Sequence, residues 1–167
     1  LSEIIGAQPV KGRHINMESL YEYGSRAGFW RLHKLFQEKK IPITVFGVGM
    51  ALEKNPEVCK AIIDADYEVA SHGWRWIDYQ NVKKSEEKKH MKLAIQAHTK
   101  IFGNRPDGWY TGRCSPNTRD LVMEDGGFLY DSDSYSDDLP YWETRNKKNQ
   151  LIIPYTLDNN DMRFATN

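Results

Sequence analysis

Short runs of branched apolar residues alternate along this chain with amphipathic segments, and this alternation restricts the possible folds more than any other feature. The run at 43–48 is almost wholly apolar, as expected for a parallel strand that is covered on both faces. Further strands are predicted at 67–70, 109–110, 128–130 and 151–153, with helices at 25–40, 55–65, 85–102 and 115–125. Strands that alternate with helices favour βαβ units and a parallel sheet, so the predicted fold class is α/β.

Helix boundaries are predicted from residues that favour caps. Ser25 is expected to cap the first helix, and Asn55 with Pro56 begins the second. Gly103 is expected to end the helix at 85–102. The buried face of the first helix would consist of Phe29, Leu32, His33 and Phe36.

The length of the chain limits how complete such a fold can be. At roughly 30 residues per βα unit, 167 residues supply about five units, whereas a closed eight-stranded barrel needs about 250 residues. We therefore expect a single domain over 1–167 that forms part of a distorted, parallel (β/α) barrel and belongs to a longer natural protein. Because an incomplete barrel leaves strand edges and apolar faces uncovered, we also expect partner segments or a homo-oligomer.

Charge and cysteine content exclude several classes of function. The 23 Lys and Arg residues balance 23 Asp and Glu residues, so no basic surface for nucleic acid or an anionic membrane is predicted. The longest apolar run, 43–52, is about half of the roughly 20 residues that a membrane-spanning helix needs. The two cysteines form no C-x-x-C motif, and the chain has no N-x-S/T site. These features favour a cytoplasmic protein with a small substrate.

Polar residues follow the predicted strands at the sheet edge where ligands bind in parallel α/β folds. His72 follows the strand at 67–70, Arg113 follows 109–110, and Asp131 and Asp133 follow 128–130. An imidazole, a guanidinium and a carboxylate together suit the attack of water on a carbonyl, because proton transfer and oxyanion stabilisation are both provided. We predict hydrolysis, with His72, Arg113 and Asp133 as catalytic residues.

Other residues near these strand ends are predicted to bind substrate. Trp74, Trp76 and Trp109 would form walls for a flat ring, although large aromatic residues at sheet ends are more often core residues. Of these, Trp76 is predicted to bind substrate, together with Tyr110 and Asp131. Side chains of Asp131 and Asp133 alternate along a strand, so only one of them should face the cleft. Arg113 would lower the pKa of the neighbouring Cys114 thiol, although no motif marks this cysteine as a nucleophile.

Several strings resemble the polysaccharide deacetylase superfamily, the NodB-homology fold of carbohydrate esterase family 4. They are ITVFGVG at 43–49, NP at 55–56, EVASHG at 68–73, RP at 105–106 and GWYTGR at 108–113. Longer strings resemble the deacetylase-like allantoinases of purine catabolism. These lie at 17–30, 131–135, 138–141, 154–158 and 160–164.

The resemblance implies a metal site that this sequence does not reproduce. Deacetylases of the superfamily bind zinc through an early Asp and a His-x-x-x-His pair, which would begin here at His72. Trp76 stands at the second position, and an indole offers no lone pair to a metal. The resemblance therefore implies the allantoinase branch, with no cofactor required and a general base expected outside 1–167.

The resemblance leads to one main hypothesis and two alternatives. The main hypothesis is a hydrolase that opens the cyclic amide of allantoin to give allantoate, with a small ureide bound by Asn160, Asp161 and Arg163. The first alternative is a metal-dependent N-deacetylase of chitin or peptidoglycan, with His72 as a zinc ligand. The second alternative is an inactive binding subunit of the same fold.

Overall fold

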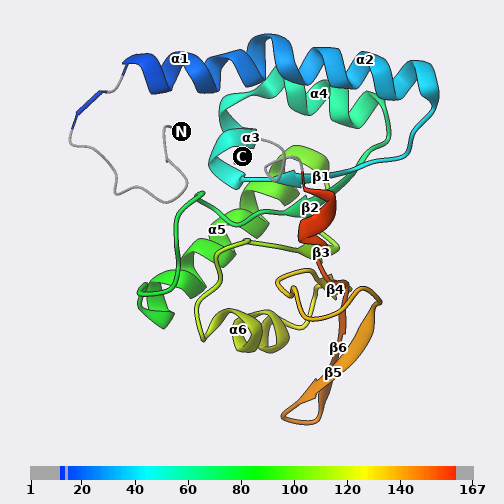
Figure 1. Ribbon diagram of the computed structural model, residues 1–167. Helices are drawn as coiled ribbons and strands as arrows, with labels where there is room; N and C mark the ends of the chain where they lie inside the picture. Colours follow the sequence, from blue (N-terminus) through cyan, green and yellow to red (C-terminus); the bar gives the residue numbers. More distant parts are fainter. Residues whose placement is uncertain (1–11, 14, 161–167) are drawn as a thin grey trace.

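The strands of the described residues form one six-stranded sheet, which is mostly parallel, as the sequence predicts. The computed structural model describes residues 12–13 and 15–160 (Figure 1). The parallel strands are β1 (Thr44–Gly47), β2 (Glu68–Ser71), β3 (Gly108–Trp109), β4 (Tyr130–Asp131) and β6 (Lys148–Ile152). The strand order is β1-β2-β3-β4-β6-β5. At the far edge β5 (Tyr141–Arg145) pairs antiparallel with β6, and this strand is not predicted by the sequence pattern.

The first helical region is longer than predicted. A helix α1 (Ile15–Tyr23), a π-helical segment η1 (Gly24–Gly28) and α2 (Phe29–Lys39) follow one another along the top of the molecule (Figure 1). The prediction that Ser25 caps a helix is wrong, because its hydroxyl donates to the Glu22 carbonyl one turn back, at 3.2 Å. Leu32 is 53% exposed, so the predicted buried face is also partly wrong.

The remaining helices are only partly predicted by the sequence pattern. They are α3 (Gly49–Lys54), α4 (Pro56–Asp64), α5 (Lys84–Phe102), α6 (Thr118–Asp125) and the 3-10 helix η2 (Leu157–Asn159). Gly103 ends α5 with a φ of +84°, as predicted. Helices α4, α5 and α6 lie close to their predicted ranges, whereas α3 and η2 are additions to the predicted elements. Each helix in the described part of the chain is too short or too polar to cross a membrane.

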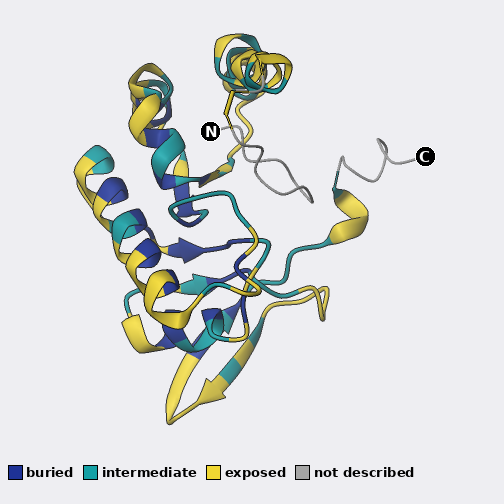
Figure 2. Ribbon diagram, turned by 90° about the vertical axis from the view of Figure 1, so that its left-hand side faces the viewer, coloured by how far each residue is buried: buried dark blue, intermediate teal, exposed yellow. Residues whose placement is uncertain are grey.

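Two apolar clusters hold the helices against the sheet. One joins Met91 of α5 and Leu121 of α6 to Trp109 of β3. The other joins Leu52, Cys59 and Ile62 of α3 and α4 to Val69 of β2. Figure 2 shows these helices packed along one side of the sheet, with buried residues between the two layers.

The first strand is less covered than the sequence pattern indicates. Thr44 is exposed and Phe46 is 36% exposed, whereas Gly47 is buried. The prediction of a strand that is covered on both faces is wrong for β1, because it is an edge strand and the helices described above lie along one side of the sheet (Figure 2). The edge position also explains why only β2 pairs with it.

Backbone hydrogen bonds fix the loop that follows β2 against the start of α3. His72 N donates to the Gly47 carbonyl at 2.8 Å, and Gly49 N donates to the Gly73 carbonyl at 2.8 Å. Gly73 has a φ of +71°, a conformation that favours glycine. A Cβ on Gly49 would lie only 2.8 Å from the ring of Trp74. Only glycine therefore lets the backbone at position 49 approach the loop this closely. The loop is thus held rigidly at the carboxyl end of the sheet.

Candidate active site

The imidazole of His72 has a defined tautomer. Its Nδ1 lies 2.7 Å from the carbonyl oxygen of Tyr110. Because a carbonyl only accepts hydrogen bonds, Nδ1 carries the hydrogen, and in the neutral ring Nε2 keeps its lone pair. Burial lowers the pKa of His72, an effect that Arg113 reinforces and that the Tyr110 carbonyl and Asp133 oppose. His72 is therefore suited to accept a proton or to ligate through Nε2.

Aromatic rings continue from His72 in a stack. The rings of His72 and Tyr110 are nearly parallel, with centroids 5.1 Å apart. The ring of Tyr155 also stacks on that of Tyr110, with centroids 4.9 Å apart. Asn160 donates through Nδ2 to the Tyr155 hydroxyl at 2.8 Å. Tyr110 and Asn160, both predicted to bind substrate, thus belong to the same group of side chains as His72. Asp161 and Arg163 lie outside the described residues.

Arg113 lies against Trp76. The guanidinium carbon is 5.3 Å from the centroid of the indole, a cation–π contact. On another side Trp76 meets Tyr21 of α1 edge to face, with centroids 6.4 Å apart. Burial is the main cause of the lowered pKa of His72, and the positive charge of Arg113 lowers it further. Arg113 and Trp76 are thus in contact and the charge of Arg113 acts on His72, while the functional roles of these three residues remain predictions.

Asp133 organises the turn that precedes Arg113. Its carboxylate accepts hydrogen bonds from Thr111 N at 3.0 Å, from Thr111 Oγ1 at 2.8 Å and from Gly112 N at 2.8 Å. Gly112 has a φ of +69° within this turn. Since the carboxylate already accepts these bonds, the geometry favours a role in positioning Arg113 over the predicted direct role in proton transfer.

The side chain of Asp131 is buried and has no access to the surface, so the prediction that it binds substrate is wrong. It is 0% exposed, and its Oδ2 lies 3.0 Å from Arg119 Nε on α6. Burial and the charge of Asp133 raise the pKa of Asp131 to about 7, whereas Arg119 opposes this shift. Arg119 also donates to the Asp133 carbonyl at 2.9 Å and pairs with Glu143 of β5. Asp131 is thus a buried residue that pairs with Arg119 and accepts a hydrogen bond from the backbone N of Asp133 at 2.8 Å.

The thiol of Cys114 does not have the lowered pKa that is expected from its neighbour Arg113. Partial burial and the charge of Asp133 raise its pKa, which is the opposite of the expected shift. The neighbouring guanidinium of Arg113 lies over Trp76 instead. A thiol with a raised pKa is a poor nucleophile at neutral pH.

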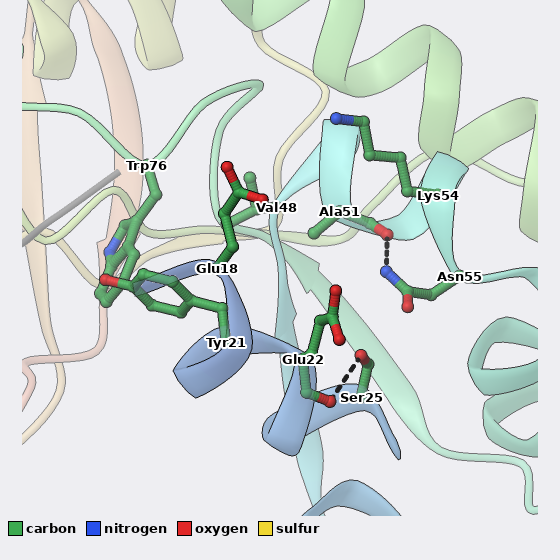
Figure 3. Close-up of a pocket in the computed structure, with 9 residues that line it drawn as sticks. All are labelled: Glu18, Tyr21, Glu22, Ser25, Val48, Ala51, Lys54, Asn55 and Trp76. Carbon is green, nitrogen blue, oxygen red and sulfur yellow. Dashed lines mark hydrogen bonds between the residues drawn. The ribbon is translucent and has the colours of Figure 1, made fainter. Parts of the chain in front are cut away.

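A cavity of about 520 Å³ adjoins Trp76 (Figure 3). Residues of α1 and η1 form one wall, and α3 with the residues that flank it forms the other. Its lining consists of Glu18, Tyr21, Glu22, Ser25, Val48, Ala51, Lys54, Asn55 and Trp76. The contribution of α1 is not predicted by the sequence pattern, because this helix begins before the predicted first helix. The cavity is large enough for a small planar ligand against the indole.

The described residues do not fit a three-ligand zinc site. His72 offers Nε2, but the indole of Trp76 occupies the position of the second histidine of the family pair. In the described part of the chain, no group of three or more His, Cys, Asp or Glu residues is arranged to hold a metal ion. That the reaction needs no cofactor remains a prediction.

The fold and the site together define an α/β domain of the NodB type, with its candidate site at the carboxyl ends of parallel strands. Residues 13–125 match the family model for polysaccharide deacetylase, and the chain belongs to this family. A Schizosaccharomyces pombe protein that bears the polysaccharide deacetylase name is 45% identical over 174 residues, which cover 95% of this chain and 54% of that protein. The peptidoglycan deacetylase of Helicobacter pylori is 26% identical over 83% of this chain and 48% of its own length.

Solved structures show the same fold. The crystal structure of PuuE allantoinase is 58% identical, with a TM-score of 0.90 over 95% of this chain and 54% of that chain. A Mycobacterium smegmatis structure that also bears the deacetylase name is 27% identical, with a TM-score of 0.79 over 86% of this chain and 50% of that chain. The chain spans about half the length of the relatives that it matches.

Proposed function

We propose that the protein hydrolyses a carbon–nitrogen bond in a cyclic amide and converts allantoin to allantoate. The observation that carries this proposal is the position of Trp76. Where the family pair has its second histidine, this chain has an indole that lies against Arg113 and lines a cavity. Similarity to PuuE allantoinase, at 58% identity, supports the same conclusion.

The chemistry follows from the groups that surround this position. Addition of water to the ring carbonyl forms a C–O bond and places negative charge on the carbonyl oxygen. The guanidinium of Arg113 would donate hydrogen bonds to that oxygen. The ring C–N bond then breaks, and the nitrogen leaves with a proton as the carboxylate forms. His72, with hydrogen on Nδ1 and a lone pair on Nε2, would orient the water or carry this proton.

The test is turnover by the full-length protein after treatment with a chelator. Each enantiomer of allantoin is supplied separately, and the formation of allantoate is measured. We expect turnover of at least one enantiomer, its loss in His72→Ala, and its retention in His33→Gln, which changes a histidine that stacks on Phe29 of α2. No turnover of either enantiomer by the wild-type protein would contradict the proposal.

A second candidate is a metal-dependent N-deacetylase, favoured by one observation. The Nε2 lone pair of His72 has the orientation of a metal ligand whose other nitrogen is held by a backbone carbonyl. Stoichiometric zinc in the purified protein and release of acetate from chitin oligomers would support this candidate. Substrate binding without turnover of either compound would instead support an inactive binding subunit.

A further inference from the structure

One buried tyrosine contacts both loops of the candidate site. Tyr79 lies in the loop between β2 and α5 that also carries His72 and Trp76, and its side chain is buried. Its backbone N donates to the Arg113 carbonyl at 3.0 Å. Its hydroxyl lies 3.5 Å from the Arg75 carbonyl and 3.8 Å from the point where a Cβ on Gly73 would lie. Tyr79 therefore joins the two segments that carry His72 and Arg113.

A buried histidine on α5 holds the hydroxyl of this tyrosine. His90 Nδ1 lies 3.1 Å from Tyr79 Oη, and the two rings meet edge to face. Its Nε2 lies 3.3 Å from Oε1 of Glu86, one turn earlier on the same helix. Since a carboxylate only accepts, Nε2 carries the hydrogen, and Nδ1 of the neutral ring accepts the Tyr79 O–H.

The helix that carries His90 is firmly anchored. Its neighbour Met91 and the nearby Ala94 belong to the apolar cluster with Trp109 of β3. The hydrogen bond to His90 therefore ties the loop that carries His72 and Trp76 to a helix that packs against the sheet.

We propose that Tyr79 and His90 are positioning residues that hold the His72 loop and the Arg113 turn in their reactive arrangement. Neither side chain lines the cavity beside Trp76, so their effect acts through the two loops. The inference rests on the proposed function for its catalytic readout. Small displacements of reacting groups lower the rate of the chemical step more than they weaken substrate binding.

The first test compares two tyrosine hydroxyls in the full-length protein. Tyr79→Phe keeps the ring and the backbone bond to Arg113 but removes the hydroxyl. Tyr67→Phe is the matched control, because it removes a hydroxyl that accepts from Gln37 Nε2 at 2.9 Å at the opposite end of β2. We expect kcat for allantoin to fall about tenfold in Tyr79→Phe with KM changed much less, and to remain unchanged in Tyr67→Phe. Equal kcat values in both variants would overturn the inference.

The second test separates the two nitrogens of His90. An asparagine at position 90 places an amide oxygen near the Nδ1 position and can accept the Tyr79 O–H, whereas a glutamine extends to the Nε2 position. We expect His90→Asn to retain most of the wild-type kcat and His90→Gln to match the loss seen in Tyr79→Phe. Equal losses in the two His90 variants would mean that packing alone is involved, and the inference would fail.

A third readout does not depend on activity. Hydrogen exchange of peptides that cover 72–82 and 111–114 should be faster in Tyr79→Phe and in His90→Gln than in the wild-type protein, while 15–39 is unaffected. Unchanged exchange in both segments would overturn the inference. If the wild-type protein turns over no allantoin but exchange accelerates as expected, the proposed function fails and the positioning role stands.

Discussion

The carbonyl of Tyr110 determines which nitrogen of His72 is basic, and burial determines when the ring is neutral. Because the pKa of His72 is lowered from 6.5, the neutral ring dominates at pH 7. We expect kcat/KM to be constant near pH 7 and to fall only below pH 6.5, as the ring gains a proton that the reaction cannot use. A pH profile of kcat/KM checks this expectation, and an acid limb centred above pH 6.5 would contradict it.

The same group makes folding depend on pH. With a folded pKa below the unfolded value, the unfolded chain binds more protons, so the contribution of His72 to stability is lost as the pH falls through the folded pKa. Asp131 acts in the opposite sense, because its pKa is raised to about 7 in the folded chain. Its contribution is present at low pH and is lost as the pH rises from about 4 to about 7. The two groups partly offset each other.

Asp133 provides a second prediction, for stability as well as activity. In Asp133→Ala the N–H groups of Thr111 and Gly112 lose their acceptor, which costs about 1–3 kcal/mol for each group left unsatisfied. The displaced turn should also lower kcat. Urea unfolding and kinetics of the full-length protein measure the two effects.

Asp137 offers the matched control for this substitution. Its carboxylate also accepts from two backbone N–H groups, those of Asp138 and Leu139, but in an exposed loop. Water replaces the lost acceptor there, so Asp137→Ala should change stability and kcat little. Equal destabilisation by the two substitutions would show that the hydrogen bonds of Asp133 stabilise the fold no more than those of the exposed Asp137.

Sequence position predicts some site residues and not others. His72 directly follows β2, and Trp76 and Arg113 lie in the loops after β2 and β3, so the strand pattern alone places all three at the carboxyl ends of the strands. It could not show that Asp131 is buried, because β4 has only two residues and Arg119, which pairs with Asp131, comes from a separate helix. Pairings between distant elements leave no periodic signal in a single sequence.

At the scale of elements, the contact between α3 and the His72 loop depends on Gly49. An added Cβ would lie 2.8 Å from Trp74, so Gly49→Ala must displace the ring or the loop. We expect a loss of stability of about 1–3 kcal/mol, typical of overpacking, and a lower kcat. In the control Gly24→Ala nothing lies within 4 Å of the new Cβ, so stability should be unchanged or higher. Equal stabilities of the two variants would contradict this account.

The elements that the sequence pattern did not predict have only weak apolar periodicity in the sequence. Helix α1 has no buried residue in the described chain, so it shows no apolar face to recognise. Helix α3 has six residues, and the hairpin of β5 and β6 is largely polar. Its turn uses Asn146 and Lys147, both with positive φ, and only the asparagine favours that conformation. Apolar runs, in contrast, predicted every parallel strand.

At the scale of the whole molecule, the sheet is left with two edge strands, β1 and β5. The chain spans about half the length of its relatives. We still predict that the rest of a longer protein or a second copy covers these strand edges and the exposed apolar residues. The outer face of α2 allows the second possibility to be tested. Leu32 and Leu35 lie one turn apart on this helix and are 53% and 44% exposed.

We expect the full-length protein to form a homo-oligomer that uses this face. The double variant Leu32→Lys, Leu35→Lys would place like charges in an apolar contact between copies. Light scattering should therefore give a lower mass for this variant than for the wild-type protein. Lys34→Glu changes an exposed charge between them and should leave the mass unchanged. A monomeric wild-type protein would reject the homo-oligomer. A double variant with unchanged oligomer mass would show instead that copies meet through another surface, such as the edge of β5.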